Sequence, residues 1–204
     1  MGELALSEIT YRYPHGDDDA LSNVNFRLAS GTTWWLRGRN GAGKTTLLDL
    51  CAGVRAPTHG SVMVDGGPVM RGQVAYLPSE LPVYPELTIA EHAALVVELW
   101  QYTARAESQF RDRFGALLSD LGMSTRSDVL GNFSQGMREK VAFAMTVARD
   151  SPVLLLDEPF SAIDREGLAY CQDLVAHVAA LRVVVLVSHV PAIVAPLHPH
   201  EIHL

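Results

Sequence analysis

The chain has 204 residues, of which 48% are hydrophobic and 19% charged, and its formal net charge is −7. This length suits one well-buried domain rather than two, and the composition is that of a globular protein rather than a disordered one. The negative charge argues against binding nucleic acid through a broad basic surface. The start of the chain lacks a secretory-signal pattern. No apolar stretch approaches the roughly 18 to 20 residues that span a bilayer.

Three short strands are predicted at the start of the chain. Residues 4–13 and 23–29 have strand patterns, and the turn-rich stretch 14–19 between them indicates an antiparallel pair. The third strand, 32–37, runs directly into a glycine-rich turn. A helix over 45–52 follows that turn.

The glycine-rich turn 38–45 fits the pattern G-x-x-x-x-G-K-[ST] in the strand-to-helix context that this phosphate-binding motif requires. Its glycines let backbone amides converge on phosphate oxygens, and the helix N-terminus adds positive potential. Lys44 can reach the β- and γ-phosphates of a nucleotide, and the Thr45 hydroxyl can bind Mg²⁺. A plain glycine-rich turn is the alternative, but the complete motif in this context favours ATP binding. The residues predicted to hold ATP here are Gly38, Asn40, Gly41, Ala42, Gly43, Lys44, Thr45 and Thr46.

Two further strands, 61–65 and 74–77, precede a stretch of different character. From 87 to 130 the pattern is helical, and it begins with a capping box formed by Thr88 and Glu91. Two apolar stripes at helical spacing follow, Ile89, Ala93, Val96, Leu99 and Trp100 in the first and Phe110, Phe114, Leu117, Leu118 and Leu121 in the second. Both stripes are predicted to form the core of the helical part rather than a groove for a partner.

A third helix is predicted over 134–149, and the α/β pattern returns after it. Residues 153–156 and 183–187 are continuous apolar runs, as expected of strands buried on both faces of a parallel sheet. A helix over 166–181 lies between them, and residues 202–204 indicate an edge strand. The apolar stripe of that helix consists of Leu168, Cys171, Leu174, Val178 and Leu181.

Two carboxylates, Asp157 and Glu158, follow the first of these buried strands. Ligands of open α/β sheets bind at the carboxyl ends of the strands, so both side chains would lie near the phosphate-binding turn. Asp157 would hold Mg²⁺, and Glu158 would polarise the attacking water. An Asp-Glu pair after a strand is often a solvated turn, but the phosphate motif upstream favours the catalytic interpretation.

Two shorter motifs allow both a structural and a functional interpretation. Ser134-Gln135-Gly136 begins a helix whose free amides can point at an anion, or it is an ordinary N-cap. Ser188-His189 follows the second buried strand, so the imidazole would lie at the same sheet edge as Lys44 and Glu158. This position favours a functional histidine over a structural one.

In their order along the chain these motifs resemble the nucleotide-binding domain of ATP-binding-cassette (ABC) transporters. The resemblance covers essentially the whole chain, and it rests on residues 38–45, Ser134-Gln135-Gly136, Leu156-Asp157-Glu158-Pro159, Ser161-Ala162-Ile163-Asp164 and Ser188-His189. It implies an α/β fold of the P-loop NTPase type, with a mainly parallel sheet, an N-terminal antiparallel portion and an inserted all-helical subdomain. A single domain over 1–204 is expected, with the α/β core at about 1–86 and 151–204 and the helical subdomain at about 87–150.

The resemblance also implies roles for individual residues. Tyr13 corresponds to the aromatic residue that stacks on adenine, and a strand-end core aromatic is the structural alternative. Ser134 and Gly136 correspond to the signature that binds the γ-phosphate held by the other subunit. Asp164 corresponds to the loop that joins the two sites, and His189 to the γ-phosphate sensor.

A head-to-tail homodimer or heterodimer with two ATP molecules between its subunits is further implied, together with Mg²⁺ and separate transmembrane permease subunits. The protein would then lie peripherally on the cytoplasmic face of a membrane, and no nucleic-acid partner is expected. The phosphate motif lies in the α/β core and the signature helix in the insert. We therefore do not expect one chain to bring both to the same nucleotide.

One position departs from the family pattern. Residues 74–78 resemble the approach to the family's glutamine loop, yet Ser79 stands at the glutamine position and Glu80 follows it. Serine is too short to reach Mg²⁺ as a long amide does, which leaves the metal contact at Ser79 open. The competing interpretation is that Glu80 reaches the metal instead.

The predicted function is that of an ATPase subunit that powers transport of a substrate across a membrane. A soluble ABC ATPase acting on nucleic acid or ribosomes is disfavoured by the net charge, by the single cassette and by the spacing of about 90 residues between Lys44 and Ser134, which is too short for a long coiled-coil arm. A regulator without catalysis is disfavoured because Glu158 and His189 are both present. The run 157–164 is similar to the haem-export ATPase of cytochrome c maturation, which inclines the prediction towards export.

Overall fold

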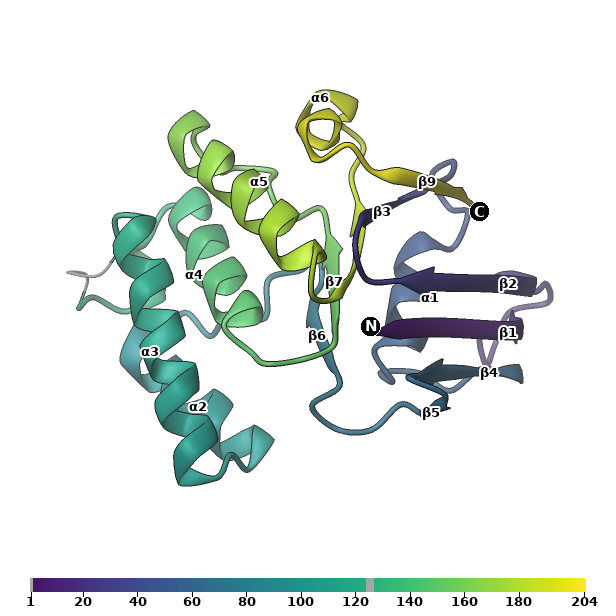
Figure 1. Ribbon diagram of the computed structural model, residues 1–204, viewed down its shortest axis with the longest axis horizontal. Helices are drawn as coiled ribbons and strands as arrows, with labels where there is room; N and C mark the ends of the chain where they lie inside the picture. Colours follow the sequence, from purple (N-terminus) through teal and green to yellow (C-terminus); the bar gives the residue numbers. More distant parts are fainter. Residues whose placement is uncertain (1, 124–126) are drawn as a thin grey trace.

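The computed structural model describes residues 2–123 and 127–204 and builds them around two sheets (Figure 1). The N-terminal sheet is antiparallel, in strand order β2-β1-β4-β5. Its strands are β1 (Glu3–Tyr11), β2 (Leu21–Ala29), β4 (His59–Val64) and β5 (Gly67–Pro68). The antiparallel pair predicted for the first two strands is confirmed, with Leu4 of β1 opposite Leu28 of β2.

The second sheet is parallel, in strand order β6-β7-β8-β3-β9. Its strands are β3 (Thr33–Arg37), β6 (Val74–Leu77), β7 (Val153–Asp157), β8 (Val183–Val187) and β9 (His200–His203). Every residue of β7 and β8 is buried, which explains their continuous apolar sequences. Since these strands are parallel, the carboxyl ends of β3, β7 and β8 share one edge of the sheet.

The helices connect and cover these strands. α1 (Lys44–Cys51) follows β3, and α5 (Arg165–Ala179) connects β7 to β8. α2 (Ile89–Trp100), α3 (Ala104–Asp120) and α4 (Gln135–Val147) lie together at the end of the molecule away from the antiparallel sheet (Figure 1). The predicted capping box of α2 is confirmed, because Thr88 and Glu91 exchange their backbone and side-chain hydrogen bonds. The remaining short elements are the 3₁₀ turns η1 (Leu130–Asn132) and η2 (Ala195–Leu197) and the helix α6 (Pro191–Val194).

The apolar core is divided by the parallel sheet itself. Leu154 and Leu156 of β7 pack on one face with residues of α2 to α5, whereas Val153 and Leu155 pack on the other face with α1 and the antiparallel sheet. Successive side chains of a strand point to opposite faces, so one strand contributes to both cores. The two cores therefore fix β7, and the carboxylates that follow it, from both sides.

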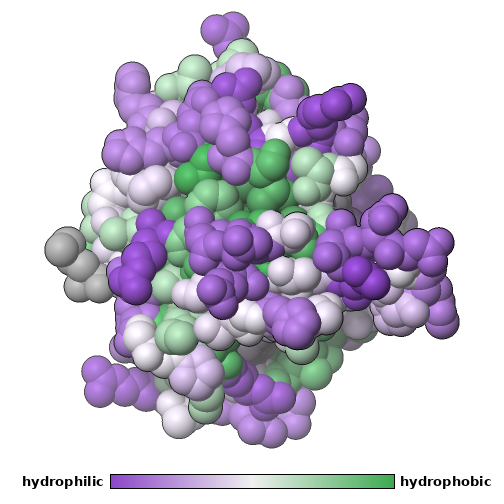
Figure 2. All heavy atoms as spheres, turned by 90° about the vertical axis from the view of Figure 1, so that its right-hand side faces the viewer, coloured by the Kyte–Doolittle hydropathy of each residue, from purple (hydrophilic) through white to green (hydrophobic). Residues whose placement is uncertain are grey.

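The outer surface of the antiparallel sheet faces solvent. Asn23, Asn25 and Arg27 of β2 are exposed, and Val24 and Phe26 between them are half-buried, the alternation expected of a half-buried strand. Viewed from this end, hydrophilic side chains surround a smaller apolar area near the centre (Figure 2).

Two residues of the predicted apolar stripes are exposed. Leu99 is 58% exposed because it lies on the side of α2 that borders a groove, so the interpretation of the first stripe as pure core was wrong at this position. Leu181 is 74% exposed because α5 ends before it, with Ala180 as the C-cap. Among residues 2–123 and 127–204, no helix is both long enough and apolar enough to cross a bilayer.

Candidate functional site

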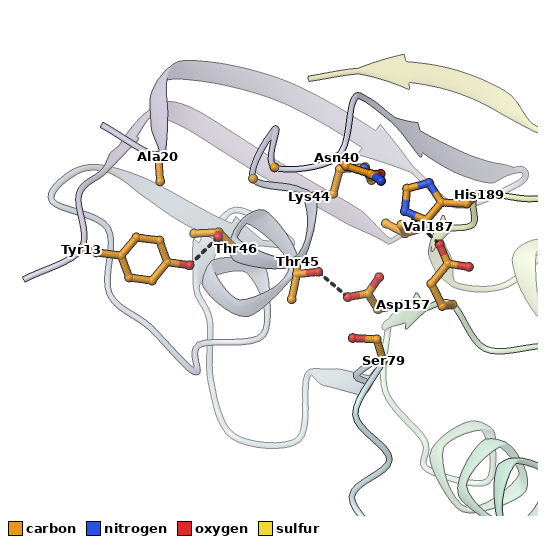
Figure 3. Close-up of a pocket in the computed structure, with 13 residues that line it drawn as sticks. Tyr13, Ala20, Asn40, Lys44, Thr45, Thr46, Ser79, Asp157, Val187 and His189 are labelled. Atoms are coloured by element: carbon orange, nitrogen blue, oxygen red, sulfur yellow. Dashed lines mark hydrogen bonds and ion pairs between the residues drawn. The ribbon is translucent and has the colours of Figure 1, made fainter. Parts of the chain in front are cut away.

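A cavity of about 500 Å³ lies where β3, β7 and β8 end and α1 begins (Figure 3). It brings together most of the residues singled out from the sequence, which come from five separate stretches of the chain. The predicted site residues that line it are Tyr13, Asn40, Gly41, Gly43, Lys44, Thr45, Thr46, Ser79, Asp157, Glu158 and His189. Ala20 and Val187 also line it, and no pattern in the sequence pointed to either.

Two glycines give the phosphate-binding turn its shape. Gly41 and Gly43 have φ angles of 81° and 94°, in the left-handed region that other residues rarely adopt. A Cβ on Gly43 would also lie 2.9 Å from the carbonyl oxygen of Ala20. The turn therefore needs glycine at 43 for both backbone angle and space, and this lets α1 begin at Lys44 with its N-terminus facing the cavity.

The Lys44 side chain is buried against its own turn. Its ammonium group donates hydrogen bonds to the carbonyl oxygens of Gly38, at 2.9 Å, and Arg39, at 3.1 Å. Gly38 and Ala42, which do not line the cavity, thus belong to the framework of the turn, and a Cβ on Gly38 would lie 3.2 Å from the Cβ of Ala42. A single positive charge is held at the centre of the turn.

Thr45 and Asp157 meet at the floor of the cavity. The Thr45 hydroxyl donates a hydrogen bond of 2.7 Å to Oδ2 of Asp157, which is only 2% exposed (Figure 3). Burial raises the pKa of Asp157 above its ordinary value, and the Thr45 hydrogen bond and the charge of Lys44 oppose that rise. The two oxygens predicted to hold Mg²⁺ are adjacent.

Glu158 and His189 lie next to each other on one side of the cavity. Nε2 of His189 lies 3.5 Å from Oε1 of Glu158, and the Glu158 amide donates a hydrogen bond of 3.0 Å to the carbonyl oxygen of Val187. Burial raises the pKa of Glu158, the charge of Asp157 raises it further, and His189 lowers it. A carboxylate with a raised pKa beside an imidazole is a suitable arrangement for moving a proton.

Tyr13 lies beyond the end of β1, not within it, because β1 ends at Tyr11. Its side chain is 40% exposed, so it is not the core aromatic of the structural alternative. Its hydroxyl lies 2.7 Å from the Thr46 hydroxyl of α1, with which it shares a hydrogen bond (Figure 3). The ring thus stands at the edge of the cavity, tied to the helix that follows the phosphate-binding turn.

Ser79 and Glu80 point to different places. Ser79 lines the cavity near Asp157, whereas Glu80 lines a separate groove (Figure 3). β6 ends at Leu77 and the chain bends at these two residues, so their side chains leave it in different directions. The arrangement favours Ser79, not Glu80, as the residue of this segment that faces the nucleotide site.

Ser134, Gly136 and Asp164 do not line the cavity. The Ser134 hydroxyl caps α4 by accepting a hydrogen bond of 3.2 Å from the Met137 amide, and Asp164 caps α5 by accepting one of 2.9 Å from the Gly167 amide. A Cβ on Gly136 would overlap the carbonyl oxygen of Ala162. The three residues are therefore near each other but apart from the phosphate-binding turn.

Glu139 and Lys140, which the sequence analysis missed, hold the start of α4 to the loop before α5. The carboxylate of Glu139 is 3% exposed and accepts hydrogen bonds from the Ser161 hydroxyl and, at 2.7 Å, from the Ala162 amide. Lys140 forms an ion pair with Asp164, and its hydrogen bond lowers the pKa of that carboxyl. A charged residue in a helical sequence usually lies on a solvated face, so nothing in the pattern marked this buried acid.

The separate groove, of about 560 Å³, lies between the segment 78–84, α2 and the end of α4. Its exposed apolar residues are Tyr84 and Leu99. Arg149 is 8% exposed and stacks over the Trp100 ring at 3.7 Å, and its Nε has no hydrogen-bond partner among the residues described. Burial lowers the pKa of this arginine. The groove thus combines an apolar lining with an incompletely satisfied cation.

Comparison with known proteins matches the family model described as ABC transporter to residues 21–161. The curated ABC transporter ced-7 of Caenorhabditis elegans is 32% identical over 177 residues, which covers 83% of this chain and 10% of that protein. The first curated relatives are much longer, and the chain spans about a tenth to a third of their length.

Two solved structures share the fold over nearly the whole chain. A structure of the ATP-binding subunit of an ABC transporter has a TM-score of 0.88 and 25% identity, and it covers 98% of this chain and 85% of its own. The dimeric structure of a bacterial ABC transporter cassette has a TM-score of 0.85 and 23% identity, with 98% and 94% covered; this second likeness concerns the fold alone. The predicted α/β fold with an antiparallel N-terminal sheet and a helical insert is confirmed. An exporter subtype is not assigned by these matches.

Proposed function

Since this chain belongs to the ABC transporter family, whose members bind ATP, we propose that it hydrolyses ATP to power movement of a substrate across a membrane through separate membrane-spanning subunits. The observation that carries this proposal is the cavity where Lys44, Asp157, Glu158 and His189 meet. Backbone amides of the turn and the N-terminus of α1 would bind the phosphates, and Lys44 would neutralise their charge.

In this proposal Glu158 orients and deprotonates the attacking water. Its raised pKa makes its carboxylate a stronger base than an ordinary glutamate, and its nearest ionisable neighbour, His189, is placed to share the proton or to contact the γ-phosphate. Tyr13, at the edge of the cavity, would stack on the adenine base.

Mg²⁺ fits the residues present. The Thr45 hydroxyl and the Asp157 carboxylate are hard oxygen donors 2.7 Å apart, and a magnesium ion bound with a nucleotide needs only one or two protein ligands besides the phosphates. When bound, the ion would neutralise charge that develops on the phosphate oxygens. Ser79 borders the same cavity, but its side chain is shorter than the glutamine of the family pattern, so we assign the metal chiefly to Thr45 and Asp157.

We further propose that two such chains, or this chain and a related one, complete each other's sites head to tail. Ser134, Gly136 and Asp164 lie outside the nucleotide cavity of their own chain, so they could contact a γ-phosphate only across an interface. The related cassette solved in dimeric form supports this arrangement.

The groove between segment 78–84 and α2 is the surface we propose for the membrane-spanning partner. Its occupant would be an apolar segment, because the lining is mainly apolar and the large side chains of Tyr84 and Leu99 are exposed in it. Residues 87–150 would then be the partner-binding subdomain of a core formed by 1–86 and 151–204. The protein would lie on the cytoplasmic face, where ATP is available, and the similarity of 157–164 to a haem exporter supports export.

Replacing Glu158 with glutamine tests the proposal. Glu158→Gln keeps the shape of the side chain but removes the base, so ATP affinity should persist while turnover falls about a hundredfold or more. The variant should remain dimeric in ATP on a sizing column. Glu86→Gln, which changes an exposed carboxylate away from the cavity in the same way, is the matched control and should behave as wild type.

A Glu158→Gln variant that turns over ATP within a few-fold of wild type would remove Glu158 from its proposed role. A wild-type chain without ATP turnover, alone and with its membrane fraction, would contradict the ATPase proposal as a whole.

A further inference from the structure

Arg55 lies against the aromatic ring that borders the nucleotide cavity. It follows the C-terminal end of α1, and the carbon atom at the centre of its guanidinium group lies 5.3 Å from the centre of the Tyr13 ring. Tyr13 lines the cavity but Arg55 does not. The guanidinium therefore covers a part of the ring that is not presented to the cavity.

Three elements hold the guanidinium in this position. Its Nε donates a hydrogen bond of 2.9 Å to Asp49 of α1, and its NH1 group donates one of 3.4 Å to the hydroxyl of Tyr11 in β1. Asp49 accepts a second hydrogen bond, of 3.2 Å, from the hydroxyl of Tyr76 in β6. The Tyr11 ring packs edge-on against Tyr13, with the ring centres 5.1 Å apart. An arginine on the surface would otherwise have many rotamers, but this one has a defined place.

The far end of the Tyr13 ring is also fixed. Its hydroxyl shares a hydrogen bond of 2.7 Å with the Thr46 hydroxyl, in the first turn of the helix that follows the phosphate-binding turn. The ring thus has contacts with Thr46 at its hydroxyl, with the Tyr11 ring and with the Arg55 guanidinium. Its remaining surface borders the space beside Ala20 and Thr46 (Figure 3).

We propose that Arg55 is a positioning residue for nucleotide binding, acting through Tyr13 to set how strongly the base is held. The inference rests on the proposed function in one respect, that Tyr13 stacks on the base. A cation over one part of an aromatic ring is attracted to its electron-rich face and restricts its rotation. A ring that is already oriented loses less entropy when a base stacks on it.

This arrangement makes base recognition separable from phosphate recognition. The phosphates contact the glycine-rich turn and Lys44, which Arg55 does not touch. Loss of Arg55 should therefore weaken binding only of ligands that carry a base. Because cation–π contacts at exposed sites are modest, we expect a two- to fivefold increase in Kd for ATP, roughly the range such contacts give.

The test compares two ligands and six proteins. Dissociation constants for ATP and for inorganic tripolyphosphate, each with Mg²⁺, are measured for wild type, Arg55→Ala, Tyr13→Ala, the double variant and Arg27→Ala. Arg27 is an arginine on β2 that is 78% exposed and does not line the cavity, which makes its substitution a matched loss of charge. Arg55→Lys is the sixth protein, and kcat and KM for ATP are measured separately for each protein.

Arg55→Ala should weaken ATP binding, leave tripolyphosphate binding unchanged, raise KM for ATP and leave kcat within twofold of wild type. In the Tyr13→Ala background it should have no further effect, since it acts through that ring. Arg55→Lys should recover only part of the loss, because lysine cannot keep both hydrogen bonds of the guanidinium fork. Arg27→Ala should match wild type with both ligands.

The failures are distinguishable. Normal ATP affinity in Arg55→Ala beside a weakened Tyr13→Ala would overturn the role of Arg55 and leave the role of Tyr13 standing. Normal affinity in Tyr13→Ala would overturn the stacking assignment itself, and this inference with it. Equal weakening for both ligands, or additive losses in the double variant, would show that Arg55 acts on the phosphates or on the fold rather than through Tyr13.

Discussion

Glu158 has both an unusual backbone angle and a buried carboxylate oxygen without a hydrogen-bond partner among the residues described. Its φ angle is 50°, in the left-handed region, and the buried oxygen is Oε1. Such strain and desolvation persist only where the surrounding structure enforces them, here the adjacent strands β7 and β8. Because burial raises the pKa of Glu158, its ionised form costs stability above the ordinary carboxyl range, and that cost disappears as the pH falls.

Gly136 is the residue where one added methyl group should have the clearest effect. A Cβ there would overlap the backbone oxygen of Ala162, which belongs to a loop already held by Glu139. We expect Gly136→Ala to destabilise the fold by about 1–3 kcal/mol, as overpacking against backbone does, and to lower ATP turnover. Urea unfolding and an ATPase assay measure both effects.

Gly115 provides the matched control for this prediction. It lies in the middle of α3, and nothing would lie within 4 Å of an added Cβ. Gly115→Ala should therefore raise the free energy of unfolding by roughly 0.5–1 kcal/mol, the usual gain in a helix interior. If Gly136→Ala were as stabilising as Gly115→Ala, the close contact between α4 and the loop before α5 would be disproved.

At the scale of elements, the local sequence of α2 predicts that it is a helix, but the fold decides which other elements it packs against. The capping box of Thr88 and Glu91 fixes where it begins, and Ile89 and Ala93 bury its first turns. Its last turn instead leaves Leu99 exposed on the groove that Arg149 also lines. The exposed apolar side chain at the end of α2 is therefore available to another molecule.

Leu99→Asp tests whether that surface binds the membrane partner. A carboxylate at this position would disrupt an apolar contact, so association with membranes should fall by at least about tenfold, which corresponds to about 1.4 kcal/mol. The fraction of tagged protein that sediments with membranes from the producing cells is the measurement.

Leu181→Asp is the control, because Leu181 is even more exposed but lies outside the groove. It should sediment like wild type, and both variants should keep the ATP turnover of the isolated subunit. Equal sedimentation of the two variants would remove the groove from the proposed partner interface.

At the scale of the whole molecule, the residues proposed to contact one nucleotide do not all meet within one chain. The cavity gathers the phosphate-binding turn, Asp157, Glu158 and His189, while Ser134 and Asp164 stand apart from it on a separate cluster. The first part follows the parallel strands, and the second lies at the starts of α4 and α5. Two chains arranged head to tail would supply both parts to each nucleotide.

Mixing two inactive variants tests this arrangement. Lys44→Ala damages the phosphate-binding turn, and Ser134→Arg damages the helix start that would reach the other subunit's nucleotide. A mixed dimer then has one site with both defects and one with neither. Random pairing should restore about a quarter of wild-type ATP turnover, because half of the dimers are mixed and each has one intact site.

The readout is ATP turnover as a function of the mixing ratio, with each variant alone as the baseline. Absence of recovery, in samples where mixed dimers are demonstrated by two different tags, would argue that each chain works alone or that both sites must act together.

The amino-acid sequence determined the features that depend on neighbours along the chain. The turn 38–45, the capping box at Thr88 and the apolar strands predicted at 153–156 and 183–187 are set by local backbone preference and by burial pattern. The structure has each of them, and the first strand is one residue longer than predicted. Asp157 and Glu158 were predicted to lie near the phosphate-binding turn because parallel strands end at a common edge.

Only the tertiary structure decided which residues meet across long separations. Contacts between distant elements decided that Leu99 is exposed and that Ser79, not Glu80, faces the cavity. Such contacts also place Arg55 over Tyr13, and Glu139 against the loop before α5. The periodicity of the sequence indicates which face of its element a side chain occupies and whether that face is apolar or charged. It does not state what covers that face, since this depends on how whole elements pack, and their packing is decided by the sum of many weak contacts.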